Sequence, residues 1–318
     1  MNRKRILWTV AAIAVTALSL HFILTDEMVR TLRRVLPEVR PLPLLLVLPL
    51  TLVINQVRSA RFSLALGTSG PGTALRMGRI CALLVFLNYM LPFKMGELSF
   101  PVLAKRTFHT PYATSIGVLI YSRVMDLLAV LSLGGFVLTA VWHREARALD
   151  RLALPVAVGA SLTLLLLPFL VIRAHDMGQR LTTSPRLLEL MERLFQGCRA
   201  VAAPRRHAAY LALTLAVWGL HATCGFLTMR AMGAHNSLLD GVLASTAASV
   251  TFAFPVSGVA GVGPMQASWA YALTIVGWKW EVAVANAFLA HATLVASSAV
   301  LGLAAVVLVE DRPVEAGS

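Results

Sequence analysis

Long apolar runs separated by short polar stretches divide this chain into segments of membrane-spanning length. A helix rises about 1.5 Å per residue, so about 20 apolar residues cross a hydrocarbon layer of about 30 Å. The runs of this length are residues 6–24, 42–66, 112–142, 152–172, 207–232 and 282–309. The pattern predicts an all-α polytopic membrane protein with six full spans, in a single integral membrane domain over residues 1–318.

Two further apolar runs are shorter, and each ends in an interruption by proline and glycine. Residues 80–91 run into Pro92 and Gly96, and residues 241–254 run into the stretch from Pro255 to Pro264. Proline removes a backbone donor and glycine weakens a helix, so both helices should break. We therefore predict re-entrant segments at 80–104 and 241–277, whose comparable places in the two halves suggest an inverted repeat.

Polar residues and glycines gather at both breaks. They are Asn88, Lys94, Glu97, Gly258, Gly261, Gly263 and Gln266. Broken helices and carboxylates are tolerated at membrane depth only inside protein or beside a wet cavity. The second break lacks the Lys-Ser/Thr ending and the preceding strand of a nucleotide-binding loop. Its backbone donors, at the start of the next helix, suit an anionic group. We predict two halves of one polar site.

Two pairs of charged residues lie inside predicted spans. Arg123 and Asp126 are three residues apart, and Arg123 lies about 16 Å from the start of its span at ~1.5 Å per residue. An unpaired charge there costs at least ~2.5–3.5 kcal/mol, so we expect these two to neutralise each other, as a structural ion pair or as part of the site. Arg58 and Arg61 share a helix face. They either snorkel to the membrane interface or contact an anionic headgroup.

Composition supports a membrane protein and assigns a direction to the chain. The sequence is 58% hydrophobic and 14% charged, with a net charge of +13. Lys and Arg lie between the apolar runs, which indicates membrane topology and attraction to anionic lipid rather than nucleic-acid binding. The basic N-terminus and the basic segment 173–206 are predicted to be cytoplasmic, with both termini inside the cell. We read 173–206 as a cytoplasmic loop that contains an amphipathic helix, with an apolar stripe from Leu187 to Cys198, lying on the inner membrane surface.

The sequence shows no recognisable catalytic or metal-binding motif. The three cysteines are scattered, and no catalytic signature is present. We expect no cofactor and no metal. If the protein were an intramembrane enzyme, its acid or base candidates would be Glu97, Asp126, His221 and His291. A lone histidine within a span, such as His221, is more often a packing residue.

The two breaks resemble those of the lysylphosphatidylglycerol synthase transmembrane family, also called flippase-like domain proteins. The residues that carry the resemblance are Asn88 to Pro92, Gly96-Glu97, Arg123 with Asp126, and Pro255, Gly258, Gly261 and Gly263. It covers nearly the whole chain in span order. Departures occur at Leu98-Ser99-Phe100, where relatives often have arginine, and at Gln266, where many have glutamate.

The resemblance implies a lipid-handling protein of the bacterial inner membrane, and we expect a translocase for a polar or anionic headgroup. The soluble aminoacyl-transferase domain of some relatives is not recognisable, so synthesis of aminoacyl lipid is not expected. The alternatives are a non-catalytic partner of a lipid or glycan synthesis enzyme, or an intramembrane enzyme acting on a lipid. The partners considered are membrane lipids, a second copy of the chain and a synthesis enzyme, with no nucleic acid.

Overall fold

The computed structural model describes residues 30, 33–34, 36–141, 148–181, 184–234, 236–253 and 262–307. Within these ranges the chain folds into helices without a strand. The segments long and apolar enough to cross a membrane are Pro41–Leu66, Thr73–Met90, Tyr112–Val141, Leu152–Leu181, Pro204–Ala231 and Trp280–Val307. The all-α polytopic membrane fold is confirmed. The predicted span at 6–24 lies outside the described residues.

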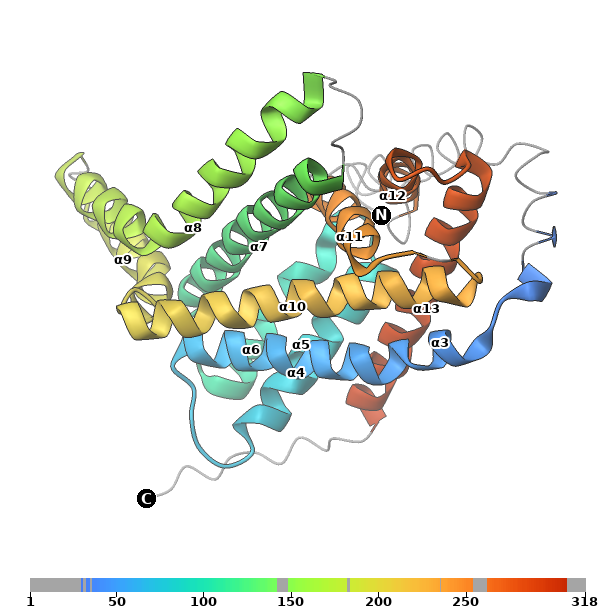
Figure 1. Cartoon of the computed structure of the whole chain (residues 1–318). Coiled ribbons are helices and arrows are strands. Elements are labelled where there is room, and N and C mark those ends of the chain that lie inside the picture. The colour runs from blue at the N-terminus through green and yellow to red at the C-terminus, as the bar shows by residue number, and fades with distance from the viewer. Residues whose placement is uncertain are drawn as a thin grey trace, which may run out of the picture.

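Figure 1 shows the order and arrangement of the helices. After a 3₁₀ turn at Leu36–Glu38, the elements of the first half are α3 (Pro41–Leu45), α4 (Val47–Leu66), α5 (Thr73–Met90), the 3₁₀ helix η2 (Pro92–Leu98), α6 (Ser99–Phe108) and α7 (Tyr112–Val141). Those of the second half are α8 (Ala148–Leu181), α9 (Pro185–Ala200), α10 (Pro204–Ala231), α11 (Leu238–Ala253), α12 (Pro264–Ile275) and α13 (Trp280–Val307).

Contacts between residues that are far apart in the sequence show in which direction each long helix runs. The Arg40 N–H donates to the Ala231 carbonyl over 2.8 Å, so α3 begins where α10 ends. Arg79 Nε donates to the Ala305 carbonyl over 2.9 Å, so α5 begins where α13 ends. The Arg76 guanidinium lies 6.0 Å from the Phe108 ring, so α6 ends at that same end of the molecule. We call this end the basic side, and the end of α10 the opposite side.

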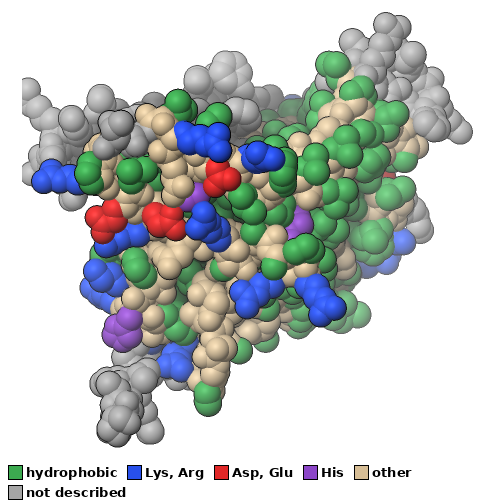
Figure 2. Space-filling model, turned by 90° about the vertical axis from the view of Figure 1, so that its left-hand side faces the viewer, with side chains coloured by type: hydrophobic (Ala, Val, Ile, Leu, Met, Phe, Trp, Pro, Cys, Tyr) green, Lys and Arg blue, Asp and Glu red, His purple; other side chains and the backbone are tan. Residues whose placement is uncertain are grey.

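The basic side carries a concentration of cationic side chains. Figure 2 looks onto this end of the molecule, where Lys and Arg side chains gather together with a few carboxylates. Exposed cations at the helix ends here include Lys105, Arg106, Arg205 and Arg206. Excess Lys and Arg mark cytoplasmic loops, so the cytoplasmic orientation of this side and of the termini stays our prediction.

The first broken segment begins earlier than predicted. We expected a half-helix of about twelve residues starting at Ile80, yet α5 starts at Thr73 and is 18 residues long. Gly72 adopts φ 71° and ends the preceding turn. Arg76 donates to the Pro71 carbonyl over 2.8 Å and Arg79 to Ala305, so both arginines are accommodated inside the helix.

The helix break itself lies where the sequence placed it. Helix α5 ends at Met90, and Pro92 opens the 3₁₀ helix η2. The chain then turns back onto α5. Gly96 lies so close to this helix that a Cβ on it would overlap the backbone nitrogen of Asn88. Only glycine fits this close approach. It brings Glu97 beside the last turns of α5.

The second broken segment is a pair of short helices that pack side by side, α11 of 16 residues and α12 of 12. The Gly263 N–H donates to Gln266 Oε1 over 2.7 Å at the start of α12. Gln266 Nε2 contacts His291 Nδ1 in the middle of the 28-residue helix α13. The Tyr89 ring, near the end of α5, lies 5.8 Å from the His291 ring. Both broken segments therefore meet α13 at one level. Re-entry into a bilayer stays a prediction.

Within the segment 173–206, helix α9 spans the predicted apolar stripe and follows the end of α8. Helix α8 continues to Leu181, and α9 packs across α7. Gly117 faces the Leu194 carbonyl closely, and Gly197 faces Val118. The apolar stripe of α9 is divided, since Leu194 packs against α7 while Leu187 remains exposed. The glycines on both helices permit this crossing, which hydrophobic periodicity could not reveal.

The close crossing of α7 and α9 predicts that Gly117→Ala destabilises the protein. A Cβ at Gly117 would overlap the Leu194 carbonyl oxygen, and such overpacking costs about 1–3 kcal/mol. The matched control is Gly219→Ala in α10, where a Cβ meets nothing within 4 Å. Thermal unfolding in detergent should show a lower midpoint for Gly117→Ala only. Equal midpoints for both variants would contradict the crossing.

Candidate functional site

A cavity of about 180 Å³ lies between the two halves of the chain. Both broken segments contribute to its wall, together with α4, α7, α10 and α13. Its lining residues include Arg58, Asn88, Tyr89, Glu97, Arg123, Trp218, His221, Ser245, Ser249, Met265, Trp269 and Ser298. The wall thus combines charged groups, hydroxyls and aromatic rings. A cavity of this size and polarity holds more than a single water molecule.

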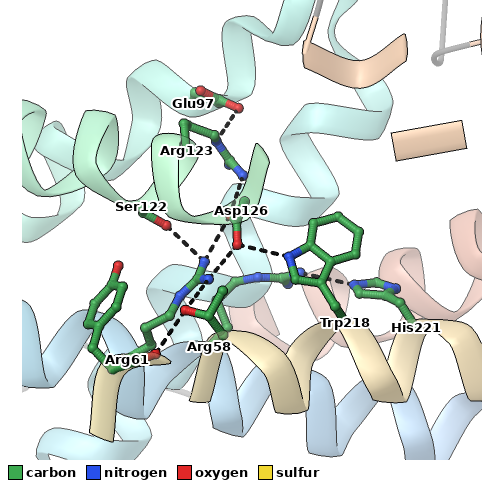
Figure 3. Close-up of polar contacts among 10 residues, drawn as sticks. Arg58, Arg61, Glu97, Ser122, Arg123, Asp126, Trp218 and His221 are labelled. Atoms are coloured by element: carbon green, nitrogen blue, oxygen red, sulfur yellow. Dashed lines mark hydrogen bonds and ion pairs between the residues drawn. The ribbon is translucent and has the colours of Figure 1, made fainter. Parts of the chain in front are cut away.

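Arg123 is the central cation of the cavity wall (Figure 3). It extends from α7, and its Nε lies 2.9 Å from Glu97 Oε1 in η2. Its Nη1 lies 3.3 Å from Asp126 Oδ2 on the same helix. The Arg123 side chain is 40% exposed and Glu97 is 20% exposed, so both remain accessible from the cavity. The sequence placed these two residues at one site but did not pair them.

Asp126 pairs with Arg123 as predicted, but its closer and bidentate partner is Arg61, which the prediction did not include. Arg61 Nη1 lies 2.5 Å from Asp126 Oδ1, and Nη2 lies 3.1 Å from Oδ2. Nη2 also donates to Ser122 Oγ over 2.8 Å, and Trp218 Nε1 donates to Asp126 over 3.2 Å (Figure 3). Such a bidentate pair supplies the partners that a buried charge requires.

Arg58 and Arg61 point to different surroundings, although they lie on one helix face. Arg61 is 1% exposed and therefore neither snorkels nor faces the cavity. Arg58 is half-buried and lines the cavity, with its Nη2 3.4 Å from His221 Nε2. Of the two predicted headgroup contacts, only Arg58 is placed where a ligand in the cavity could reach it.

The lysylphosphatidylglycerol synthase TM region matches residues 9–302 of the chain. The chain belongs to this family. No curated protein and no solved structure gave a match. The family resemblance seen in the two broken helices is therefore confirmed across nearly the whole sequence.

The other predicted residues of this family member lie at different distances from the cavity. Asn88 lines it, and its buried Oδ1 has no hydrogen-bond partner among the described residues. Gln266 is fully buried behind the wall, next to the lining residue Met265, and Gly263 caps α12. The side chain of Lys94 and the glycines Gly258 and Gly261 lie outside the described residues.

Sequence reasoning missed the aromatic and hydroxyl part of the wall. Tyr89, Trp218, Trp269, Ser245 and Ser249 all line the cavity. In an apolar span such residues are expected to pack against other helices. Only their position in the folded chain, close to the two breaks, identifies them as cavity residues. His221, which we read as packing, also lines the cavity.

The buried ion pair of this family member predicts a large stability loss for Arg61→Met. Removing one partner of a buried pair leaves an uncompensated charge and costs about 3–5 kcal/mol. The control is Arg193→Met, whose partner Glu189 is 62% exposed, and such surface pairs contribute about 0–1 kcal/mol. Thermal unfolding in detergent should separate the two variants.

Replacing both charges tests the same interaction from the other direction. The double variant Arg61→Met with Asp126→Leu should recover most of the lost stability, since apolar replacement of a whole buried pair is often neutral. A single variant as stable as the surface control would refute the assigned pairing.

Proposed function

We propose that this protein moves lipids with a polar, anionic headgroup across the membrane through the cavity between its two broken segments. The supporting observation is the Arg58 and Arg123 pair of cations in that cavity, set against one carboxylate, Glu97. Asp126 is neutralised by Arg61 behind the wall. Among the described residues, the lining thus carries two positive charges and one negative charge, which favours a negatively charged headgroup.

The cavity would lower the free-energy cost of moving a headgroup through hydrocarbon, which makes unassisted crossing slow. A charged headgroup in hydrocarbon loses its hydration at a cost of many kcal/mol. Here Arg58 and Arg123 would supply charge-assisted hydrogen bonds, and Ser245, Ser249 and Asn88 would supply neutral ones. The acyl chains would remain in the bilayer.

Glu97 would make binding reversible. It already occupies Arg123 Nε at 2.9 Å, so an arriving phosphate must displace this carboxylate to gain the guanidinium. When the headgroup leaves, Glu97 returns and restores a neutral pair. A competing internal anion keeps affinity moderate, which transport requires.

The membrane and the orientation belong to the same proposal. Family membership and the basic side support a bacterial inner membrane with that side in the cytoplasm and both termini inside. Of the acid and base candidates of an enzymatic alternative, Asp126 is held by Arg61 and His291 contacts Gln266, while Glu97 and His221 line the cavity.

Reconstituted vesicles test the transport proposal. Arg123→Gln should slow inversion of a fluorescent phosphatidylglycerol by about ten-fold or more, the change expected when a charge-assisted hydrogen bond of ~1.5–3 kcal/mol is lost. Dithionite quenching of the outer leaflet measures the rate. The matched control is Arg230→Gln, an exposed residue at the end of α10 that does not line the cavity.

The outcome also decides between the alternatives. Inversion that is absent in the unmodified protein, with no accumulation of a modified lipid, would favour a non-catalytic partner role. Formation of a new lipid without inversion would favour an enzyme. Equal rates for Arg123→Gln and Arg230→Gln would remove the cavity from the mechanism.

A further inference from the structure

The two halves of the described chain repeat one order of elements. A long helix, a broken segment and a second long helix follow as α4, α5–η2–α6 and α7, and again as α10, α11–α12 and α13. The packing is exchanged between the halves, since α5 packs on α13 and α11 packs on α7, while α4 packs on α10. Such reciprocal packing is what an internal two-fold axis produces.

The repeated halves run in opposite directions. Helix α13 ends at the basic side, where Arg79 contacts Ala305. Helix α7 begins at that side, because it follows α6, whose Phe108 lies beside Arg76. The broken segments accordingly approach the cavity from opposite ends, the first from the basic side and the second from the opposite side.

A polar contact stands at the equivalent place in each half. Arg123 is the eleventh residue after Tyr112, the first of α7, and His291 is the eleventh after Trp280, the first of α13. Each contacts a polar residue just beyond the break of its own half, Glu97 for Arg123 and Gln266 for His291. The repeat therefore relates the contact Gln266–His291 to the ion pair Glu97–Arg123.

The two contacts differ in access. The Arg123 side chain is 40% exposed and faces the cavity. Gln266 is fully buried and His291 is 4% exposed, although Tyr89 and Met265 beside them line the cavity. One half thus presents its polar contact to the cavity while the other half holds its contact closed. This is the asymmetry expected when one structure captures one state of an alternating pair.

We propose that the Gln266–His291 contact is the gate of the opposite side, a role that rests on the transport function proposed above. In the described state the contact joins α12 to α13 and seals the cavity there. In the alternate state it separates, the headgroup reaches Gln266 and His291, and the Glu97–Arg123 pair becomes the sealed one. An amide–imidazole contact suits a gate because a neutral hydrogen bond costs less to separate than a buried ion pair.

Thiol labelling from each side of the membrane tests the gate without measuring transport. The reporter is Ser249→Cys on α11, which lines the cavity, in a background with Cys81, Cys198 and Cys224 replaced by alanine. Membrane-impermeant maleimide is added to oriented vesicles from either side. Gln266→Ala should raise labelling from the opposite side by about five-fold, the population change expected for one lost hydrogen bond, and leave labelling from the basic side unchanged.

Two further variants keep the test decisive. Gln196→Ala, on the exposed face of α9, is the matched control and should change neither rate. Gln266→Glu preserves the side-chain shape and adds a charge that strengthens the contact with His291, so opposite-side labelling should fall below that of the parent. If Gln266→Ala raised labelling equally from both sides, or from neither while remaining folded, the gate would be wrong.

The labelling result is separable from the transport result. One-sided opening with no lipid inversion would support the gate and remove the proposed substrate. Inversion that depends on Arg123, together with labelling unaffected by Gln266→Ala, would support transport and overturn the gate.

Discussion

The buried ion pair between Arg61 and Asp126 is the interaction on which the cavity depends. It joins α4 to α7, and the Trp218 indole brings α10 to the same carboxylate. A charge at membrane depth must be paired or it destabilises the fold by several kcal/mol. Because Arg61 neutralises Asp126 from behind the wall, Arg123 is left to face the cavity and to share its guanidinium with Glu97. Structural and functional charges are thereby separated within one network.

Local sequence features predicted the breaks but not their partners. Pro92 and Gly96 act on the backbone within a few residues, so the end of α5 and the turn at η2 could be read from the sequence alone. The contact of Asp126 with Arg123, three residues away, could be predicted, whereas its second and closer partner Arg61, 65 residues away, could not. Periodicity identifies the nearest compatible charge, while the fold selects the one with better bidentate geometry.

The same distinction explains the remaining corrections. The apolar run that starts at Ile80 left Arg79 outside the predicted half-helix, yet Arg79 lies inside α5, where it donates a hydrogen bond to the Ala305 carbonyl at the end of α13. The apolar stripe of α9 suggested a helix on the membrane surface, yet paired glycines allow it to cross α7 closely. In each case a residue far away in the sequence contacts a side chain or a helix face that the local sequence pattern assigned to water or lipid. The sequence predicted one polar site between the two breaks, but it did not predict the aromatic residues of the cavity wall.

A transport site must bind a headgroup strongly enough to replace water and weakly enough to release it. A cavity with two unopposed cations would retain a phosphate, because charge-assisted hydrogen bonds are stronger in a poorly solvated site. In the proposed mechanism Glu97 would prevent this, because it pairs with Arg123 at 2.9 Å and would compete with an anion for the guanidinium. In the other half, Gln266 carries an amide at the place where Glu97 carries a carboxylate. Under the proposed mechanism the two ends of the path therefore differ, because the headgroup meets a competing carboxylate at one end and an amide at the other.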